Sequence, residues 1–164
     1  MWLWNAESGE VLQKFTGGGF RNVAFSPDGK SMASGFSSGM AQTWEVDTGK
    51  KLHSLTGPGG SVDAVTWSPD GKTLACSTAN YWTIDQIRVW DTGSGRLLSL
   101  VTPLADSQGL ALSPAGHFRG TPGLERELVY VVQTDAGQDS LTPEQFAARF
   151  GWKNERDSVR FTAQ

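Results

Sequence analysis

The stretch VAFSPDGK, residues 23–30, decides how the rest of this sequence is interpreted, because it returns twice. It recurs 42 positions later as VTWSPDGK at residues 65–72 and, 45 positions further on, in the weaker form LALSPAGH at residues 110–117. A regular period of this length indicates a repeat protein. Ser-Pro-Asp-Gly has the composition of a type I turn with proline at its second position, so strands are expected on both sides of it.

A second motif alternates with the first. It reads LWNAESGE at residues 3–10, TWEVDTGK at residues 43–50 and VWDTGSGR at residues 89–96, which places tryptophans 40 and 46 positions apart. Together the two motifs divide each unit into four strands, expected in the first complete unit at residues 22–25, 31–34, 40–46 and 51–55. Such a unit has two apolar faces, so it must stack on neighbouring units to bury them.

These interlocked motifs resemble those of the WD-repeat β-propeller family, over about residues 1–117. In that family a blade carries a Trp-Asp dipeptide after an aliphatic strand. Trp90-Asp91 keeps the dipeptide, whereas Trp4-Asn5 and Trp44-Glu45 are variants of it. The family's Gly-His pair lacks its histidine here, at Gly18-Gly19 and at Gly59-Gly60.

The resemblance implies an all-β fold, a partial and open β-propeller of about three blades' worth of four-stranded antiparallel sheets, with a short C-terminal strand and helix. Residues 1–19 are expected to form half a blade, residues 20–60 and 61–106 two full blades, residues 107–118 the start of a last blade, and residues 119–164 the extension. The structural repeat positions are Trp4, Trp44, Trp90, Asp91, Asp28, Gly29, Asp70 and Gly71. The three tryptophans among them are expected to lie in the core.

The blade count sets an expectation about the whole protein. Closed propellers typically have about four to eight blades, which is more than this chain supplies. The first interpretation is therefore a C-terminal fragment of a longer protein that provides the missing N-terminal blades. The alternative is a homodimer of six blades, in which the N-terminal strands of one chain complete the last half blade of the other.

The residues after the repeats have their own pattern. Residues 127–133 form a continuous apolar run, as expected for a strand buried on both faces. Thr142 and Gln145 match a capping box with Pro143 between them, so a helix of about two turns is expected to start there and to place Phe146 and Phe150 against the propeller edge. The segment resembles the tails of some bacterial multidomain WD-repeat proteins, in which a kinase or peptidase domain can precede the propeller.

Composition narrows the classes of function. The chain has 164 residues, with 14 Lys+Arg against 17 Asp+Glu and a formal charge of -3, which gives no electrostatic reason to bind nucleic acid or an anionic membrane. No apolar run is long enough to span a bilayer, and the N-terminus lacks the pattern of a secretory signal. We therefore expect a cytoplasmic protein.

The sequence shows no arrangement typical of an enzyme, cofactor site or metal site. His53 and His117 are 64 positions apart and neither belongs to a Ser or Cys motif, while the single cysteine, Cys76, is best interpreted as a small buried hydrophobe. Gly-Lys-Ser and Gly-Lys-Thr follow Asp28 and Asp70, but the remaining glycine of a phosphate-binding loop is missing. The chain is therefore expected to have no catalytic residues, cofactor or metal.

Partner-binding residues are expected on the face opposite the Ser-Pro-Asp-Gly turns, which carries residues 17–20, 36–40, 57–60 and 79–84. Aromatic residues on protruding loops are favoured as interface anchors. The chain is accordingly predicted to be a non-enzymatic scaffold that binds other proteins through WD repeats. The alternative is a regulatory or targeting segment of a multidomain kinase or peptidase whose catalytic domain lies upstream. The candidate contact residues are Tyr81, Trp82, Phe36, Gly57 and Pro58.

Overall fold

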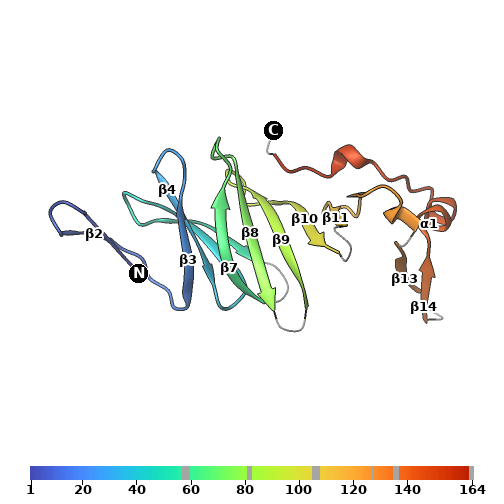
Figure 1. Ribbon diagram of the computed structural model, residues 1–164, viewed down its shortest axis with the longest axis horizontal. Coiled ribbons are helices and arrows are strands. Elements are labelled where there is room, and N and C mark those ends of the chain that lie inside the picture. Colours follow the sequence, from blue (N-terminus) through green and yellow to red (C-terminus); the bar gives the residue numbers. More distant parts are fainter. Residues whose placement is uncertain (57–59, 81–82, 105–107, 127, 135–136, 163–164) are drawn as a thin grey trace.

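The computed structural model describes residues 1–56, 60–80, 83–104, 108–126, 128–134 and 137–162. Antiparallel strands dominate, and the described strands form an open row along the long axis of the molecule, with the N-terminal hairpin at one end and helix α1 near the other (Figure 1). No helix in these ranges is long and apolar enough to cross a membrane. The all-β, open propeller-like fold expected from the repeats is confirmed.

The strands form four sheets. The first is a hairpin of β1 (Trp2–Trp4) and β2 (Val11–Lys14), and the second is the four-stranded sheet of β3 (Phe20–Phe25), β4 (Ser31–Phe36), β5 (Met40–Glu45) and β6 (Lys51–Thr56). The third has six strands in order: β7 (Ser61–Trp67), β8 (Thr73–Asn80), β9 (Thr83–Asp91), β10 (Leu97–Pro103), β11 (Gly109–Leu112) and β12 (Phe118–Gly120). The fourth is a hairpin of β13 (Tyr130–Thr134) and β14 (Gly137–Leu141).

The Ser-Pro-Asp-Gly segments form the expected turns. The Gly29 backbone N–H donates to the Ser26 carbonyl oxygen at 2.9 Å, the Ser26 hydroxyl donates to Asp28 Oδ1 at 2.6 Å, and the same carboxylate oxygen accepts from the Lys30 N–H at 3.0 Å. Asp70 repeats this pattern with its own serine and lysine. These bonds to the charged form lower the pKa of Asp28, the serine hydroxyl having the largest effect.

The turns after the repeat tryptophans explain why variants of the Trp-Asp dipeptide are tolerated. Asp91 Oδ1 accepts from the backbone N–H and hydroxyl of Ser94 at 2.7 and 2.6 Å. Asn5 Oδ1 accepts two backbone N–H groups of its own turn, and Glu45 accepts from the Thr48 hydroxyl. The residue after each repeat tryptophan therefore accepts a hydrogen bond that closes the turn, and an Asp, Asn or Glu side chain can do this.

Two clusters of buried side chains hold the sheets together. One lies between the β1–β2 hairpin and the β3–β6 sheet and consists of Phe15, Met32, Phe36 and Trp44. The other lies between the β3–β6 and β7–β12 sheets and consists of Ala33, Ala41, Leu55, Val62, Val65, Leu74, Cys76 and Trp90. Stacked sheets therefore bury the apolar faces that a single unit would expose, as the repeat pattern predicts.

Trp4 departs from the other repeat tryptophans. Trp44 and Trp90 are 3% and 7% exposed, but Trp4 is 56% exposed, so its assignment to the core is wrong. Leu3 packs toward the β3–β6 sheet, and because neighbouring residues of a strand point to opposite faces, Trp4 lies on the other face of the hairpin. No described sheet covers that face.

The segment 107–118 differs from its expected arrangement. Instead of starting a separate blade, β11 pairs with β10, with Leu100 opposite Leu112 and Pro103 opposite Gly109. Two isolated strands would make a marginal sheet, whereas this pairing gives the outer edge of β10 a backbone partner. The second full blade and the start of the last one therefore form one continuous sheet.

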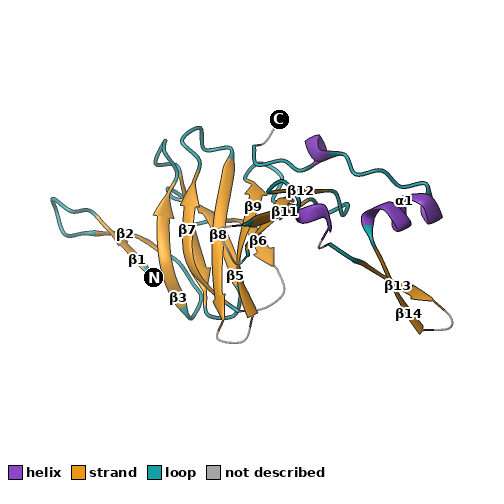
Figure 2. Ribbon diagram, turned by 45° about the vertical axis from the view of Figure 1, so that its right-hand side comes forward, coloured by secondary structure: helices purple, strands orange, loops and turns teal. Residues whose placement is uncertain are grey.

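The C-terminal extension contains two 3-10 turns, η1 (Leu124–Arg126) and η2 (Arg156–Ser158), and the helix α1 (Pro143–Phe150). The predicted helix is confirmed, with the capping box between Thr142 and Gln145 and with Gly151 in the left-handed conformation, φ +62°. Figure 2 shows α1 and the β13–β14 hairpin standing away from the larger sheets.

Two expectations for the extension are wrong. The apolar run does not form a strand buried on both faces: Val129 and Val131 are 60% and 61% exposed, because β13 pairs only with β14 at the margin of the molecule. Phe146 does not dock on the propeller edge either. The Phe146 ring stacks instead on the ring of Tyr130, in β13 of the C-terminal hairpin, with ring centroids 4.4 Å apart.

Candidate functional site

The face predicted to bind partners is only partly described. Gly57, Pro58, Tyr81 and Trp82 lie outside the described residues. Phe36 is described and is 4% exposed, with its ring 4.8 Å from Phe20. Phe36 is the last residue of β4 and packs toward the N-terminal hairpin instead of lying on a loop, and its role in partner contact stays a prediction.

A groove of about 410 Å³ does open beside this face, between the N-terminal hairpin and the β3–β6 sheet. Its polar lining includes Ser38, Gln42 and Lys51, and its apolar lining includes Phe36 and Trp44. The sequence alone could not predict this groove, because it depends on how the hairpin packs on the sheet.

The glycines beside the groove have a structural explanation. Gly17 has φ +147°, and a Cβ there would lie 3.2 Å from Phe20 Cζ. Gly19 has φ +80°, and a Cβ there would lie 2.6 Å from the Ser37 hydroxyl oxygen. Both positions therefore need glycine for backbone conformation and close approach, whether or not a ligand is bound.

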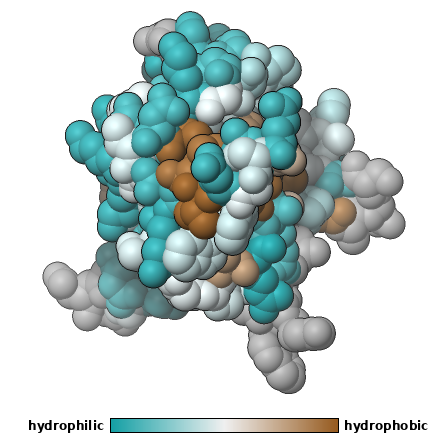
Figure 3. Space-filling model, turned by 90° about the vertical axis from the view of Figure 1, so that its left-hand side faces the viewer, coloured by the Kyte–Doolittle hydropathy of each residue, from teal (hydrophilic) through white to brown (hydrophobic). Residues whose placement is uncertain are grey.

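A second surface was missed by the sequence reasoning: the outer face of the β1–β2 hairpin. Trp2, Trp4, Val11 and Leu12 are all at least 44% exposed there. Seen end-on, this part of the molecule has apolar side chains gathered at its middle and polar ones around them (Figure 3). The missed signal was that residues 1–19 supply only two strands of a unit, so no described sheet packs on the outer side of the first repeat tryptophan.

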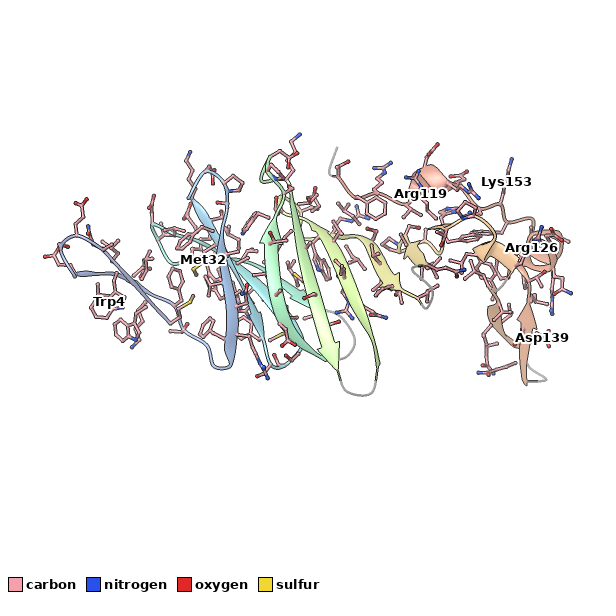
Figure 4. All side chains as sticks on the ribbon, viewed as in Figure 1. Trp4, Met32, Arg119, Arg126, Asp139 and Lys153 are labelled. Atoms are coloured by element: carbon pink, nitrogen blue, oxygen red, sulfur yellow. The ribbon has the colours of Figure 1, made fainter. Side chains whose placement is uncertain are left out.

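The hairpin face also contains a cation. Lys14 Nζ lies 4.7 Å from the centre of the Trp2 ring, and the Trp2 and Trp4 rings are 6.4 Å apart. Figure 4 places Trp4 at the outer end of the molecule and Met32, a member of the buried cluster, farther in. An exposed group of large apolar side chains with a polar rim is typical of an interaction surface.

The histidines and the cysteine have structural surroundings. His117 Nδ1 accepts from the Glu155 backbone N–H at 3.1 Å, and its ring stacks on Trp152. His53 packs so closely on Gly95 that a Cβ there would lie 2.7 Å from its Nδ1. Burial raises the pKa of the Cys76 thiol to about 12, which disfavours the reactive thiolate.

The interpretation of Cys76 as a small buried hydrophobe is confirmed, since it is 2% exposed within the larger core cluster. Within the described ranges there is no group of three or more His, Cys, Asp or Glu side chains that could hold a metal ion.

Comparison with known proteins agrees with the fold and the turn geometry. The family model described as "WD domain, G-beta repeat" matches residues 9–45 and 49–82. The repeat region is therefore built from WD40 repeats and belongs to the WD-repeat family, as a partial β-propeller.

Two curated relatives share these repeats. The chain is 30% identical over 111 residues to apoptotic protease-activating factor 1 of Rattus norvegicus, covering 66% of this chain and 9% of that protein. It is 34% identical over 87 residues to small ribosomal subunit protein RACK1z of Oryza sativa subsp. japonica, covering 52% of this chain and 24% of that protein. Neither relative is bacterial, so the expected resemblance to bacterial WD-repeat proteins is not supported.

Proposed function

We propose that the chain is a non-enzymatic scaffold that binds other proteins through its WD repeats. The observation that carries this proposal is how the repeats use their polar side chains. Asn5, Asp28, Asp70 and Asp91 all accept hydrogen bonds from their own turns, so the signature residues hold the shape of the sheets. The groove remains as a surface for a partner protein, and the outer hairpin face as a surface for a neighbouring sheet.

The relatives support a role in assembly. RACK1z is described by its name as a protein of the small ribosomal subunit, and hence as part of a larger complex. The chain spans less than a quarter of each relative, so a shared partner is not inferred from this similarity. What we carry over is a place in a larger assembly, which in this chain would rest on contacts made by the surface of its β-sheets.

Matched variants of the groove test the proposal. Ser38 lines the groove and is exposed, so Ser38→Arg should block a partner there, whereas Ser54→Arg on the outer strand β6 should not. A protein that co-purifies with the wild-type chain and with Ser54→Arg, is lost with Ser38→Arg, and binds again when both components are pure would support the scaffold. Identical co-purifying proteins in all three samples would contradict a role for the groove.

A second candidate function is a regulatory segment of a larger protein. The observation that favours it is the match to 9% of a protein named as a protease-activating factor. The DNA upstream of the codon for Met1 provides the test: an in-frame kinase or peptidase domain supports the regulatory role. An in-frame stop immediately before Met1 contradicts it.

We further propose that another four-stranded unit covers the outer hairpin face. Trp44 packs against Phe15 of the preceding unit, with ring centroids 5.9 Å apart, and Trp4 occupies the equivalent position with no described sheet against it. The covering unit belongs to missing N-terminal blades of the same protein or to a second copy, in either case in the cytoplasm.

Solution mass distinguishes the two sources of the covering unit. A second copy predicts a mass of twice 17.7 kDa that returns to 17.7 kDa in the double variant Trp2→Glu/Trp4→Glu. A wild-type mass of 17.7 kDa together with a cooperative melt excludes the homodimer.

A further inference from the structure

A cavity of about 570 Å³ lies where the C-terminal extension meets β12, the edge strand of the β7–β12 sheet. It opens between β12, the start of α1 and the residues that follow α1, with Phe118, Ala147 and Trp152 as its apolar lining. Its volume is within the range of small-molecule and short-peptide pockets, about 300 to 1,000 Å³.

The walls of this cavity are held in place by specific contacts. Trp152 stacks on His117, with ring centroids 5.3 Å apart and the rings inclined by 17°, and its edge meets Tyr130 at 5.3 Å. Asn154 Oδ1 accepts from the Phe118 backbone N–H at 2.8 Å, and Asn154 Nδ2 donates to the Phe118 carbonyl oxygen at 2.9 Å. The pocket is therefore formed before any ligand arrives, which reduces the entropic cost of binding.

The cavity is positively charged on a chain that is negative overall. Among the described residues that line it, Arg126, Lys153 and Arg156 are basic and Glu144 is acidic, while the chain carries a formal charge of -3. In the part of the chain that the structure describes, neither Arg126 nor Lys153 forms an ion pair. Figure 4 shows both residues at the end of the molecule that carries the extension. Cations around a concave surface raise the local concentration of anions.

We propose that this pocket binds an acidic peptide segment in which carboxylates flank an aromatic side chain. Arg126 and Lys153 would take the carboxylates, since charge-assisted hydrogen bonds to carboxylate are among the strongest available to them. Trp152 and Phe118 would take the aromatic ring. Nucleic acid fits less well, because it is bound by extended rows of cations along its phosphates and this chain is acidic.

The proposal does not depend on the scaffold function proposed above. The pocket is formed by the extension and the edge strand β12, whereas the groove and the hairpin face lie at the N-terminal end of the repeats, so the two proposals can fail separately. The probe is an acetylated and amidated peptide, Glu-Asp-Phe-Asp-Glu, titrated into the full chain by calorimetry. Two comparison peptides replace its acids by amides, Gln-Asn-Phe-Asn-Gln, or its phenylalanine by glycine, Glu-Asp-Gly-Asp-Glu.

A charge-reversed pair of variants locates the binding. The variant Arg126→Glu/Lys153→Glu should lower the affinity for the acidic peptide by about tenfold or more. Lys30→Glu/Lys72→Glu, on the repeat turns, changes the net charge equally and should leave affinity within about twofold. Lys153→Arg should retain binding, and the far-ultraviolet circular dichroism of each variant shows whether it is folded.

The expected pattern is saturable binding of the acidic aromatic peptide, weaker binding of both comparison peptides, and loss of affinity as salt rises from about 0.05 M to about 0.5 M. Absence of saturable binding, equal binding of the amide peptide, or equal loss in both charge-reversed variants would overturn the proposal. So would an oligouridylate that binds in place of the peptide and is lost with Arg126→Glu/Lys153→Glu.

Discussion

The stacked repeats and the N-terminal hairpin contain the same signature tryptophan in two different environments. Trp44 is enclosed by Phe15, Phe20 and Phe36, whereas Trp4 lies largely in solvent. Both lie at or next to the end of a strand, and both precede a turn closed by a side-chain acceptor. The comparison teaches that the motif specifies a strand and its turn, while burial of the tryptophan requires the neighbouring sheet.

The largest expected effect breaks this comparison directly. Trp44→Ala removes a ring from a well-packed cluster and should lower the free energy of unfolding by about 3 to 5 kcal/mol. The equivalent substitution Trp4→Ala should cost less than about 1 kcal/mol, because the ring is mostly exposed. Urea unfolding followed by circular dichroism measures both, and equal losses would show that Trp4 is buried in solution.

The next prediction concerns the distance between the stacked sheets. A Cβ at Gly35 would lie 2.6 Å from the Val62 carbonyl oxygen of the neighbouring sheet, so Gly35→Ala must force the backbones apart. We expect the free energy of unfolding to fall by about 2 kcal/mol, the usual cost of overpacking.

Gly18→Ala is the matched control for Gly35→Ala, because a Cβ at Gly18 meets no atom within 4 Å. Urea unfolding of the two alanine variants compares them with the wild-type chain. If both lose the same stability, steric pressure between the sheets is not the cause.

A smaller and more local effect is expected where the extension meets the repeats. Asn154→Asp keeps the acceptor for the Phe118 N–H but loses the donor to the Phe118 carbonyl oxygen. The free energy of unfolding should fall by about 1 kcal/mol. Hydrogen exchange should accelerate in the extension and at β12 but not in β4 or β8. Faster exchange throughout the sheets would mean that the extension and the repeats unfold as one unit.

The smallest expected effect is on the turns. The pKa of Asp28 and of Asp70 is lowered by the adjacent serine hydroxyl and backbone N–H, so their contribution to stability is present above the unfolded pKa, near 3.8. It is lost as pH falls through the lower folded pKa. Ser26→Ala should raise the pKa of Asp28 toward 3.8 and leave the pKa of Asp70 unchanged, so that Asp70 serves as the internal reference. Carboxyl NMR measures both values. An unchanged pKa of Asp28 would exclude the Ser26 hydroxyl as the cause of its lowered value.

Much of the repeat region could be predicted from local sequence. Ser26, Asp28 and Gly29 bond within a few residues of themselves, so their geometry does not depend on distant contacts. The same holds for Thr142 and Gln145, whose capping box was predicted correctly. The burial of Phe36 could not be predicted in this way, because Phe36 was assigned by loop position and its burial depends on the packing of another sheet.

By itself, the sequence determined the repeat, the turns, the strand order within a unit and the start of α1, since all of these rest on interactions between near neighbours. Only the tertiary structure decided that β11 extends the sheet of β10, that Trp4 is exposed, and that Phe146 packs on Tyr130. Those outcomes depend on which surfaces meet, and contacts between distant segments are not encoded in the period of a repeat. The charged pocket of the extension belongs to the second group, because its lining comes from segments that only the fold brings together.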